Sequence, residues 1–360
     1  MRIVSPDFAK DFRCLAGECP DSCCRQGWQI DVDPEHRELY ESMSGALGER
    51  VRAALTESGL RMTDGVCALL DEDGLCPIVK ELGEEGLCRI CRTHPRFLEQ
   101  YGGVREVHFS LSCPEAARLA LMRETPISFC EETTDEAVTE PNELDPDEYT
   151  ALLALRDGAI RLMQQRRQSI TDRLALLINA AEAFQRVLDR KRYGTARFVA
   201  ARLRVEKIQR RTLRGLARLR DEGTSFLPDV ALLRELETLT AEFPAALHDA
   251  VFTAKSGAEF DRENALAMEH MTVLWLAHYM PKAVNDGRVD TKLLLAAFLT
   301  LCTRRLCVCT GRSPAHVAGL LAKEIEHSEE NVAHLCMALE AEGWSAHLIA
   351  QLDRRDDYAD

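Results

Sequence analysis

The sequence predicts a mainly α-helical protein in which a small, loop-rich domain organised around metal precedes an all-α domain. Ten of the 14 cysteines lie within the first 130 of the 360 residues, where glycine turn signals are frequent and helical periodicity is scarce. From about residue 145 the chain is rich in Ala, Leu, Arg and Glu, and its apolar residues recur at helical spacing. We therefore expect a cysteine-rich metal-binding domain at 1–130, an acidic linker at 131–149 and an all-helical domain at 150–360.

The composition is that of a soluble globular protein, with 46% apolar and 29% charged residues. The N-terminal residues lack the apolar segment of a secretory signal, and the uncharged stretch 293–303 is too short for a bilayer, which needs about 20 residues. We expect a cytoplasmic protein without a membrane partner, whose reduced thiols bind metal rather than form disulfides. The net charge of −14 argues against general affinity for nucleic acid and would suit a partner that presents lysines.

Three regular elements are expected in the N-terminal domain. Asp33 is placed to cap a helix that begins at Pro34 and runs to about residue 56. The segment 104–111 alternates in polarity as a short strand does, and a second short helix is expected at 114–122.

The segment 131–149 contains nine Asp or Glu residues and no Lys or Arg, and its two prolines would break a helix. We interpret it as a solvated linker. A lip that attracts lysines to a site is the alternative.

Helical periodicity predicts eight helices after this linker, as in the series Leu174, Leu177, Ile178, Ala181 and Phe184. The predicted ranges are 147–165, 171–192, 195–220, 229–241, 261–280, 290–309, 314–323 and 328–341.

Arginines recur every seven residues across the second and third of these helices, as Arg190, Arg197, Arg204, Arg211 and Arg218. On a helix they would form one ridge, opposite apolar residues such as Phe198, Ile208 and Leu219. We interpret this arginine ridge as a solvated face that pairs with acidic segments. A surface for an acidic partner or for nucleic acid is the alternative, and the scarcity of aromatic residues argues against stacking on single strands.

Nine N-terminal cysteines fall into four short groups, and soft thiolates so placed select zinc or an iron–sulfur cluster. Only Cys88 and Cys91 have the spacing of a zinc knuckle. The vicinal pair Cys23–Cys24 is awkward for one tetrahedral ion, because successive side chains diverge in an extended backbone. Nine thiols exceed one zinc, and a [4Fe–4S] cluster needs four, so a cluster with a second metal, or with further buried thiols, fits the count. The groups are Cys14, Cys19, Cys23 and Cys24; Cys67 and Cys76; Cys88 and Cys91; and Cys113.

The other five cysteines are expected to be free and buried, packing as small apolar residues. They are Cys130, Cys302, Cys307, Cys309 and Cys336. The Cys-x3-Cys-x2-Cys pattern of radical S-adenosylmethionine enzymes is not met, because its third position is Gln26. Neither a G-x-G-x-x-G following a predicted strand nor a P-loop is present in the sequence.

A dense set of short motifs spans residues 8–122: Phe12-Arg13-Cys14, Cys19, Cys23-Cys24, Gly27-Trp28, Gly74-Leu75-Cys76, Leu82-Gly83, Cys91-Arg92-Thr93, Pro95-Arg96 and Leu111-Ser112-Cys113-Pro114-Glu115-Ala116-Ala117. These motifs resemble those of the flagellin lysine-N-methylases, and the cysteine part also resembles small zinc- or iron-chelating domains with a vicinal cysteine pair. The resemblance covers about a third of the chain.

This resemblance implies an enzyme that uses S-adenosylmethionine to methylate the ε-amines of surface lysines on flagellin. It also implies that the cysteine domain binds a metal, as a [4Fe–4S] cluster with zinc as the alternative metal. Which four thiols would hold a cluster stays open. The metal-ligand candidates are Cys14, Cys19, Cys23, Cys24, Cys67, Cys76, Cys88, Cys91 and Cys113.

Direct methyl transfer needs a neutral lysine amine, whose ordinary pKa is about 10.4. A desolvated slot or a base must therefore remove the proton. Each candidate base also has an ordinary structural role, so no catalytic residue is assigned. The candidate bases are Asp31, Asp33, Glu115, His94 and His108, and Arg92 and Arg96 are candidates to hold the cofactor carboxylate.

Two other functions stay open. One is a non-enzymatic metal or iron–sulfur protein whose helical domain binds a partner. The other is an iron–sulfur sensor that binds nucleic acid through the arginine ridge.

Overall fold

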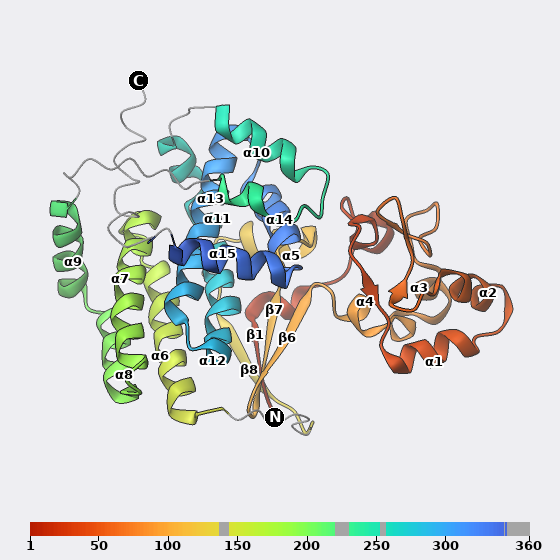
Figure 1. Cartoon of the computed structure of the whole chain (residues 1–360), viewed down its shortest axis with the longest axis horizontal. Coiled ribbons are helices and arrows are strands. Elements are labelled where there is room, and N and C mark those ends of the chain that lie inside the picture. The colour runs from red at the N-terminus through yellow and green to blue at the C-terminus, as the bar shows by residue number, and fades with distance from the viewer. Residues whose placement is uncertain (137–143, 220–229, 253–256, 342, 344–360) are drawn as a thin grey trace.

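The computed structural model describes residues 1–136, 144–219, 230–252, 257–341 and 343 (Figure 1). It confirms a mainly helical protein with an all-helical C-terminal region and a small N-terminal region rich in strands and loops. Figure 1 shows three parts: a helical body, a sheet at its edge, and a small lobe set to one side. The small lobe comprises residues 13–94.

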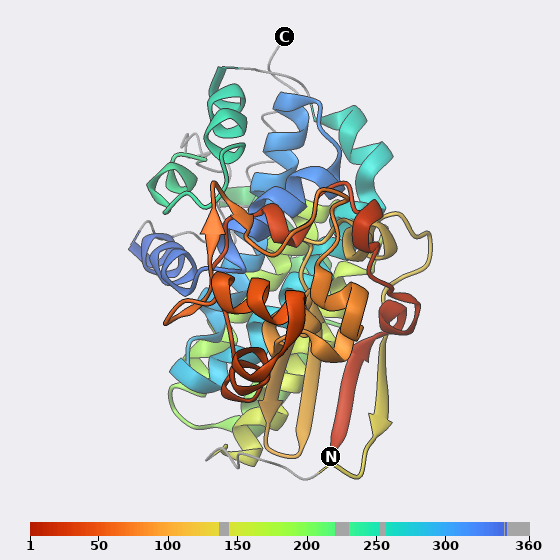
Figure 2. The ribbon, with the colours of Figure 1, turned by 90° about the vertical axis from the view of Figure 1, so that its right-hand side faces the viewer.

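The four-stranded sheet joins the two ends of the N-terminal region. Its strands are β1 (Arg2–Pro6), β6 (Arg96–Tyr101), β7 (Val104–Phe109) and β8 (Phe129–Thr133), in the order β6-β7-β1-β8. Strand β1 is parallel to β7 and antiparallel to β8, and Figure 2 shows β1 and β8 side by side. The predicted strand at 104–111 is therefore confirmed as β7. Strand β8 extends into the start of the predicted acidic linker. Its residues pair with β1 through backbone hydrogen bonds, and Arg2 of β1 also pairs with Glu131 of β8 at 3.4 Å.

The small lobe is built from short elements. The helix predicted from Pro34 to residue 56 is broken at Met43 and Ser44, where the backbone is extended. Gly48 allows the second half to fold back, because a Cβ there would lie 2.2 Å from the Met43 carbonyl oxygen. The elements are η2 (Ala16–Glu18), η3 (Cys23–Arg25), β2 (Ile30–Asp31), α1 (Pro34–Ser42), α2 (Gly45–Ala54), β3 (Gly59–Leu60), β4 (Met62–Thr63), β5 (Val66–Cys67), α3 (Pro77–Leu82), η4 (Glu84–Gly86) and α4 (Arg89–Thr93).

The helical body is organised around α13, which packs against helices α7, α10, α11, α14 and α15. Among the described residues, α13 has the length and hydropathy of a membrane-crossing helix, but 78% of its apolar window is buried inside the protein. The helices are α5 (Pro114–Leu121), α6 (Pro146–Met163), α7 (Ile170–Leu188), α8 (Tyr193–Arg202), α9 (Glu206–Leu219), α10 (Phe243–Phe252), α11 (Ala258–Tyr279), α12 (Ala283–Asp286), α13 (Val289–Thr310), α14 (Pro314–Ile325) and α15 (Glu329–Ala341). Three short turns accompany them: η1 (Asp7–Asp11), η6 (Leu232–Glu235) and η7 (Met280–Lys282).

Most predicted helices are confirmed within a few residues, and two predictions were wrong. The range 195–220 is divided into α8 and α9 by a turn at 203–205, and the range 230–241 holds only the turn η6, whereas α10 was not predicted. The arginine ridge is consequently interrupted. Arg190 follows the end of α7, Arg197 lies on α8, Arg204 lies in the turn before α9, and Arg211 and Arg218 lie on α9. Phe198, expected on the buried side opposite the ridge, is 66% exposed. The side chain of Leu219 and residues 220–229 lie outside the described part.

The fold gives the five remaining cysteines different degrees of burial. Cys302, Cys307 and Cys309 are buried in α13, as expected, and Cys336 is half-buried. Cys130 is exposed on β8, because its strand lies at the edge of the sheet. The prediction of a buried Cys130 was therefore wrong.

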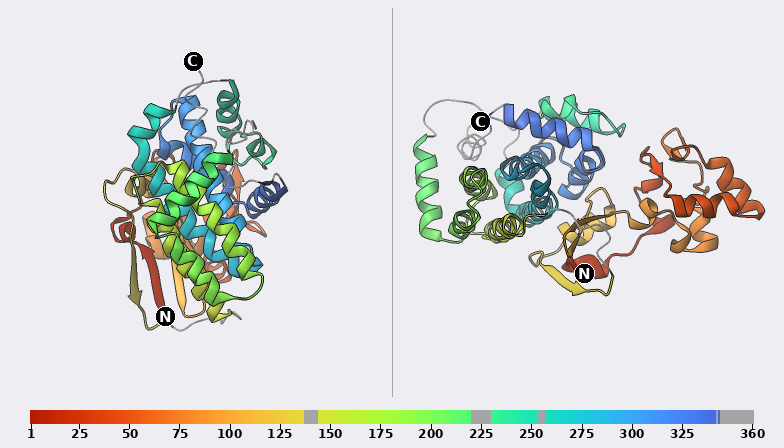
Figure 3. Two further views of the ribbon diagram at one scale, coloured as in Figure 1. Left: turned by 90° about the vertical axis from the view of Figure 1, so that its left-hand side faces the viewer. Right: turned by 60° about the horizontal axis from the view of Figure 1, so that its bottom comes forward.

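Two apolar clusters divide the buried residues. One joins Phe8, Phe12 and Phe109 at the sheet with α5 and the helices of the body. The other lies wholly within the small lobe, between Ile30 and Cys88. The sheet thus packs with the helices, as the views in Figure 3 also show. The domain boundaries at 130 and 149 stay predictions.

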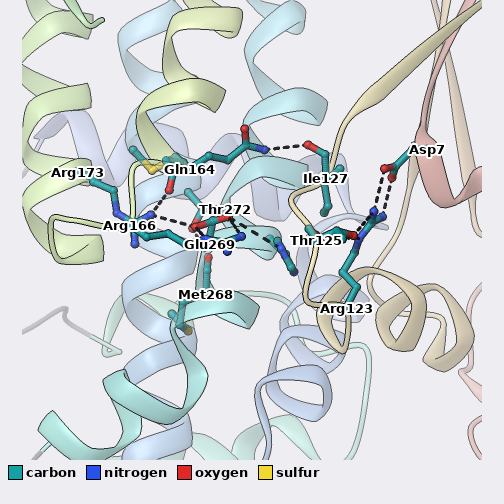
Figure 4. Close-up of polar contacts among 12 residues, drawn as sticks. Asp7, Arg123, Thr125, Ile127, Gln164, Arg166, Arg173, Met268, Glu269 and Thr272 are labelled. Carbon is teal, nitrogen blue, oxygen red and sulfur yellow. Dashed lines mark hydrogen bonds and ion pairs between the residues drawn. The ribbon is translucent and has the colours of Figure 1, made fainter. Parts of the chain in front are cut away.

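A buried carboxylate ties the helices of the body together. Glu269 of α11 is fully buried and accepts two hydrogen bonds of 3.0 Å from Arg166 and one of 3.3 Å from the buried Arg173 (Figure 4). Nearby, Gln164 donates to the Ile127 carbonyl, and Arg123 forms a bidentate pair with Asp7 beside β1. Because a charge without water needs partners, this group fixes α6, α7 and α11 against the loop that follows α5.

We expect Glu269→Ala to lower the free energy of unfolding by about 3–5 kcal/mol, because it leaves the buried Arg173 without its carboxylate partner. Urea denaturation followed by far-UV circular dichroism measures this. Glu263→Ala, at an exposed position of the same helix, is the control and should change the value by less than about 0.5 kcal/mol. Equal stabilities for the two variants would contradict the structural role of Glu269.

Candidate metal centre

All nine cysteines that the sequence analysis singled out line one cavity of about 450 Å³. The cavity lies where the small lobe meets the sheet and α5: Ile30, Tyr40 and Ile78 belong to the lobe, and Arg96 and Pro114 to the body. Cys130 and the cysteines of α13 and α15 are outside its wall. The fold therefore brings together thiols that are up to about a hundred residues apart in the sequence.

Local sequence places several of these thiols at helix starts. Cys76 and Cys113 are N-cap residues, because Pro77 and Pro114 occupy the first helical positions of α3 and α5. Cys88 caps α4 in the same way, without a proline. Cys23 and Cys24 form the turn η3, whose N-cap Ser22 accepts a hydrogen bond from the Cys24 amide.

Backbone amides point at most of the thiols. Each N–H group favours the thiolate form of its sulfur, and contacts of this kind orient metal-bound thiolates. The amide donors are Ala16 to Cys14, Asp21 to Cys19, Leu69 to Cys67, Ile78 and Val79 to Cys76, Cys91 to Cys88, and Glu115 and Ala116 to Cys113.

Burial and mutual contact set the thiol pKa values in opposite directions. Burial raises the pKa of Cys67 to about 11 and also raises the pKa values of Cys19, Cys76 and Cys113. Hydrogen bonds from the thiols of Cys23 and Cys91 lower the pKa values of Cys24 and Cys88 to about 7. Most of the thiols are thus protonated at neutral pH, and a metal that binds them must displace their protons.

The donor set fits a metal group. Nine soft sulfur ligands with amide partners have the chemistry that selects iron–sulfur clusters or zinc. The cavity is also much larger than one ion, whose four sulfur ligands would lie about 2.3 Å from it. Asp33, Glu35 and His36 form a second, smaller group within 4.8 Å. There Asp33 accepts hydrogen bonds from the His36 amide and ring and from the Arg89 amide, so the group is explained as a helix cap.

The fold separates the candidate bases. His94 and Glu115 line the cavity, and Glu115 is held by a bidentate pair with Arg118 at 2.7 Å. Asp31 is exposed on β2, Asp33 is occupied at its helix cap, and His108 is buried on β7 against the helical body. Only two of the five candidates therefore face the thiols.

Both candidate arginines line the cavity, together with Arg13. The Arg96 guanidinium lies over the rings of Phe12 and Phe109, at 4.8 and 5.1 Å from their centres. Arg92 donates to Glu85 at 2.9 Å. Three arginines thus line the cavity with the thiols, Arg13 and Arg92 from the lobe and Arg96 from the sheet.

A row of histidines and aromatic rings joins the cavity to the body, and sequence reasoning missed it. Trp28 of the lobe stacks on His327, which follows α14, at 4.1 Å, and the His94 ring lies 5.6 Å from Trp28. His327 Nε2 is 3.0 Å from the Ser112 hydroxyl, 215 residues away along the chain. Lys323 of α14 also pairs with Asp21 of the lobe at 2.5 Å. No local pattern signals contacts of such separation.

The site is thus a thiol-lined cavity at the junction of a small lobe and a helical body. Comparisons of the chain with known proteins identify relatives. The chain is 31% identical over 124 residues to the flagellar biosynthetic protein FliU of Salmonella muenchen, which covers 31% of this chain and 73% of FliU. It is 28% identical over 142 residues to lysine-N-methylases of Salmonella choleraesuis and Salmonella typhimurium. No model of a known protein family and no solved structure matches.

The chain belongs to the family of the flagellar biosynthetic protein FliU. With the lysine-N-methylases the similarity spans 36% of this chain and 35% of their length, about a third of each. The activity named for those relatives therefore enters below as a proposal.

The buried histidines predict sensitivity to acid. Burial lowers the pKa of His94 to about 4 and those of His108 and His327 to about 3. Glu106 lies 3.5 Å from His108, but it is paired with Arg156 at 2.6 Å, so burial and the Arg156 charge decide the direction. An unfolded histidine titrates near pH 6.5. Between about pH 6.5 and 3 the unfolded chain thus binds protons that the folded chain excludes. The free energy of unfolding therefore decreases as the pH is lowered through this range.

We expect the free energy of unfolding to fall between pH 7 and pH 5, by about 1–2 kcal/mol for each buried histidine. His108→Gln should reduce this loss, because one excluded proton is removed. Urea denaturation at both pH values measures the difference. An unchanged pH dependence in His108→Gln would show that His108 is not buried in its neutral form.

Proposed function

We propose that this chain is a protein-lysine N-methyltransferase that uses S-adenosylmethionine to methylate surface lysines of flagellin, with a cysteine-bound [4Fe–4S] cluster. The observation that carries the proposal is the single cavity lined by all nine cysteines that the resemblance singles out. The similarity to lysine-N-methylases and to FliU supports it from the sequence. The cavity connects these two lines of support, because candidate metal ligands and charged groups for substrates line the same cavity.

The ligands of the cluster would come from the nine thiols. A bound iron–sulfur cluster would supply redox-active, Lewis-acidic iron, and zinc, the alternative metal, would supply Lewis acidity alone. The chain's own contribution is to place the sulfurs at the starts of helices and beside backbone amide donors.

The arginines supply the charge that the cofactor needs. S-adenosylmethionine carries a carboxylate, and a guanidinium binds a carboxylate through two parallel hydrogen bonds. Arg13 and Arg96 line the cavity, and the partial burial that lowers the Arg96 pKa also strengthens its attraction for an anion. Arg92 is the less suitable candidate, because Glu85 already neutralises it.

The target lysine must lose its proton, and His94 is the base that the cavity favours. Burial keeps its imidazole neutral at pH 7, with a lone pair available. A weak base of this kind accepts a proton only from a lysine whose own pKa is lowered, and the apolar wall of Ile30, Leu60 and Ile78 provides that desolvation. Glu115 is the second candidate, but its Arg118 partner lowers its pKa and reduces its basicity.

The test is a methylation assay with purified, metal-loaded protein, flagellin and S-adenosylmethionine, analysed by peptide mass spectrometry. We expect methyl groups on flagellin lysines, and a loss of rate of about 100-fold or more in His94→Ala, as is typical when a general base is removed. Cys130→Ser, outside the cavity, is the control and should keep full activity. A metal-loaded protein that adds no methyl group to lysine would contradict the proposal.

A second function is favoured by one observation. All five arginines of the ridge are exposed, and three of them lie on α9 or on the turn before it. A non-enzymatic metal protein that binds an acidic partner through this surface would keep its metal and show salt-sensitive binding, without methyl transfer. The assay above separates the two functions.

A further inference from the structure

The nine cavity thiols fall into two sets by what they pack against. Five belong to the apolar core of the small lobe or pack against it, and we call them the lobe thiols: Cys24, Cys67, Cys76, Cys88 and Cys91. The other four are the junction thiols, Cys14, Cys19, Cys23 and Cys113. Of these, Cys113 packs against the core of the helical body, and the first three lie on the segment that leads from the body into the lobe.

The electrostatic neighbours largely follow the same division. The exceptions involve the vicinal pair, because Cys24 also influences Cys19 and Cys23 also influences Cys91. After burial, the charges that raise the pKa of Cys67 are those of Cys24, Cys76 and Cys88, which are all lobe thiols. For Cys113 they are those of Cys19 and Cys14, which are junction thiols. Each set therefore forms a group of neighbouring sulfurs, and both sets line the same cavity.

The vicinal pair lies at the boundary of the two sets. Cys23 is influenced by Cys14 and Cys113, whereas Cys24 influences Cys67 and Cys76. Both residues belong to the 3₁₀ turn η3, in which successive side chains point about 120° apart. Two successive thiols are poorly placed for one ion, but they are well placed for one ligand to each of two adjacent centres.

We propose that the cavity holds two metal centres, one bound by four of the lobe thiols and a second bound by the junction thiols Cys14, Cys19, Cys23 and Cys113. Four thiolates at each centre select iron, alone or in a cluster, or zinc. The junction centre would also fasten the lobe to the body. Its ligand Cys113 stands at the start of helix α5 of the body, whereas its ligand Cys23 belongs to the lobe. This inference concerns metal content, so it stands or falls independently of methyl transfer.

The test compares metal content in two double variants of the full chain, purified without oxygen. Cys76→Ser with Cys91→Ser removes two lobe thiols, and Cys14→Ser with Cys113→Ser removes two junction thiols. Cys130→Ser with Cys336→Ser is the matched control. Iron, zinc and acid-labile sulfide are measured per chain, together with the visible spectrum, which detects an iron–sulfur cluster but not zinc.

We expect each cavity variant to lose a different part of the metal, so that the two losses add up to the content of the unchanged chain, and the control to lose none. Loss of the same metal in both variants, or full metal in the junction variant, would overturn the proposal. Alkylation of the unchanged, metal-loaded chain, read by mass spectrometry, does not depend on the folding of variants. If two centres are present, both sets of thiols should resist alkylation until a chelator is added. Junction thiols that are alkylated while the lobe thiols resist would also overturn the proposal.

Discussion

The convergence of nine thiols on one cavity is the constraint on which the N-terminal half of the structure depends. The apolar core of the small lobe has only ten buried residues, and two of them are Cys67 and Cys88. A core of that size supplies little stability, and small domains commonly rely on metal or disulfides instead. Burial also makes ionised thiols costly, unless a metal compensates for their charge. The short helices of the lobe are therefore best understood as supports for sulfur ligands.

The helical body provides the rigid side of this arrangement. The buried Glu269 and its arginines fix α6, α7 and α11, and the loop after α5 is tied to the same region through Gln164. Because α5 is held in this way, Cys113 at its start has a fixed position in the cavity wall. His327 and Lys323 lie on or beside α14, which packs against α5, and they contact Trp28 and Asp21 of the lobe. The body thus contributes one ligand candidate and the contacts that orient the lobe.

This architecture clarifies the relation between metal binding and methyl transfer. The thiols, the arginines and His94 share one cavity, so a metal group and a polar substrate would be neighbours rather than occupants of separate domains. The non-enzymatic alternative requires only the thiols and an exposed charged surface elsewhere. The arginine ridge runs from the turn after α7 to α9. These helices lie on the side of the body away from the lobe in Figure 1, so the ridge is remote from the cavity.

Sequence patterns correctly predicted the mainly helical fold class and the long helices such as α7, α13 and α14, and they pointed out the nine clustered thiols. These features are local: helical periodicity, caps such as Asp33 and Ser313, and cysteine spacing are all read within about twenty residues. Only the tertiary structure decided that β8 is a strand, that β1 and β7 pair in parallel, and that Trp28 meets His327. It alone also sorted the thiols into two sets. Such contacts join residues a hundred or more positions apart, and packing selects them after the local elements have formed.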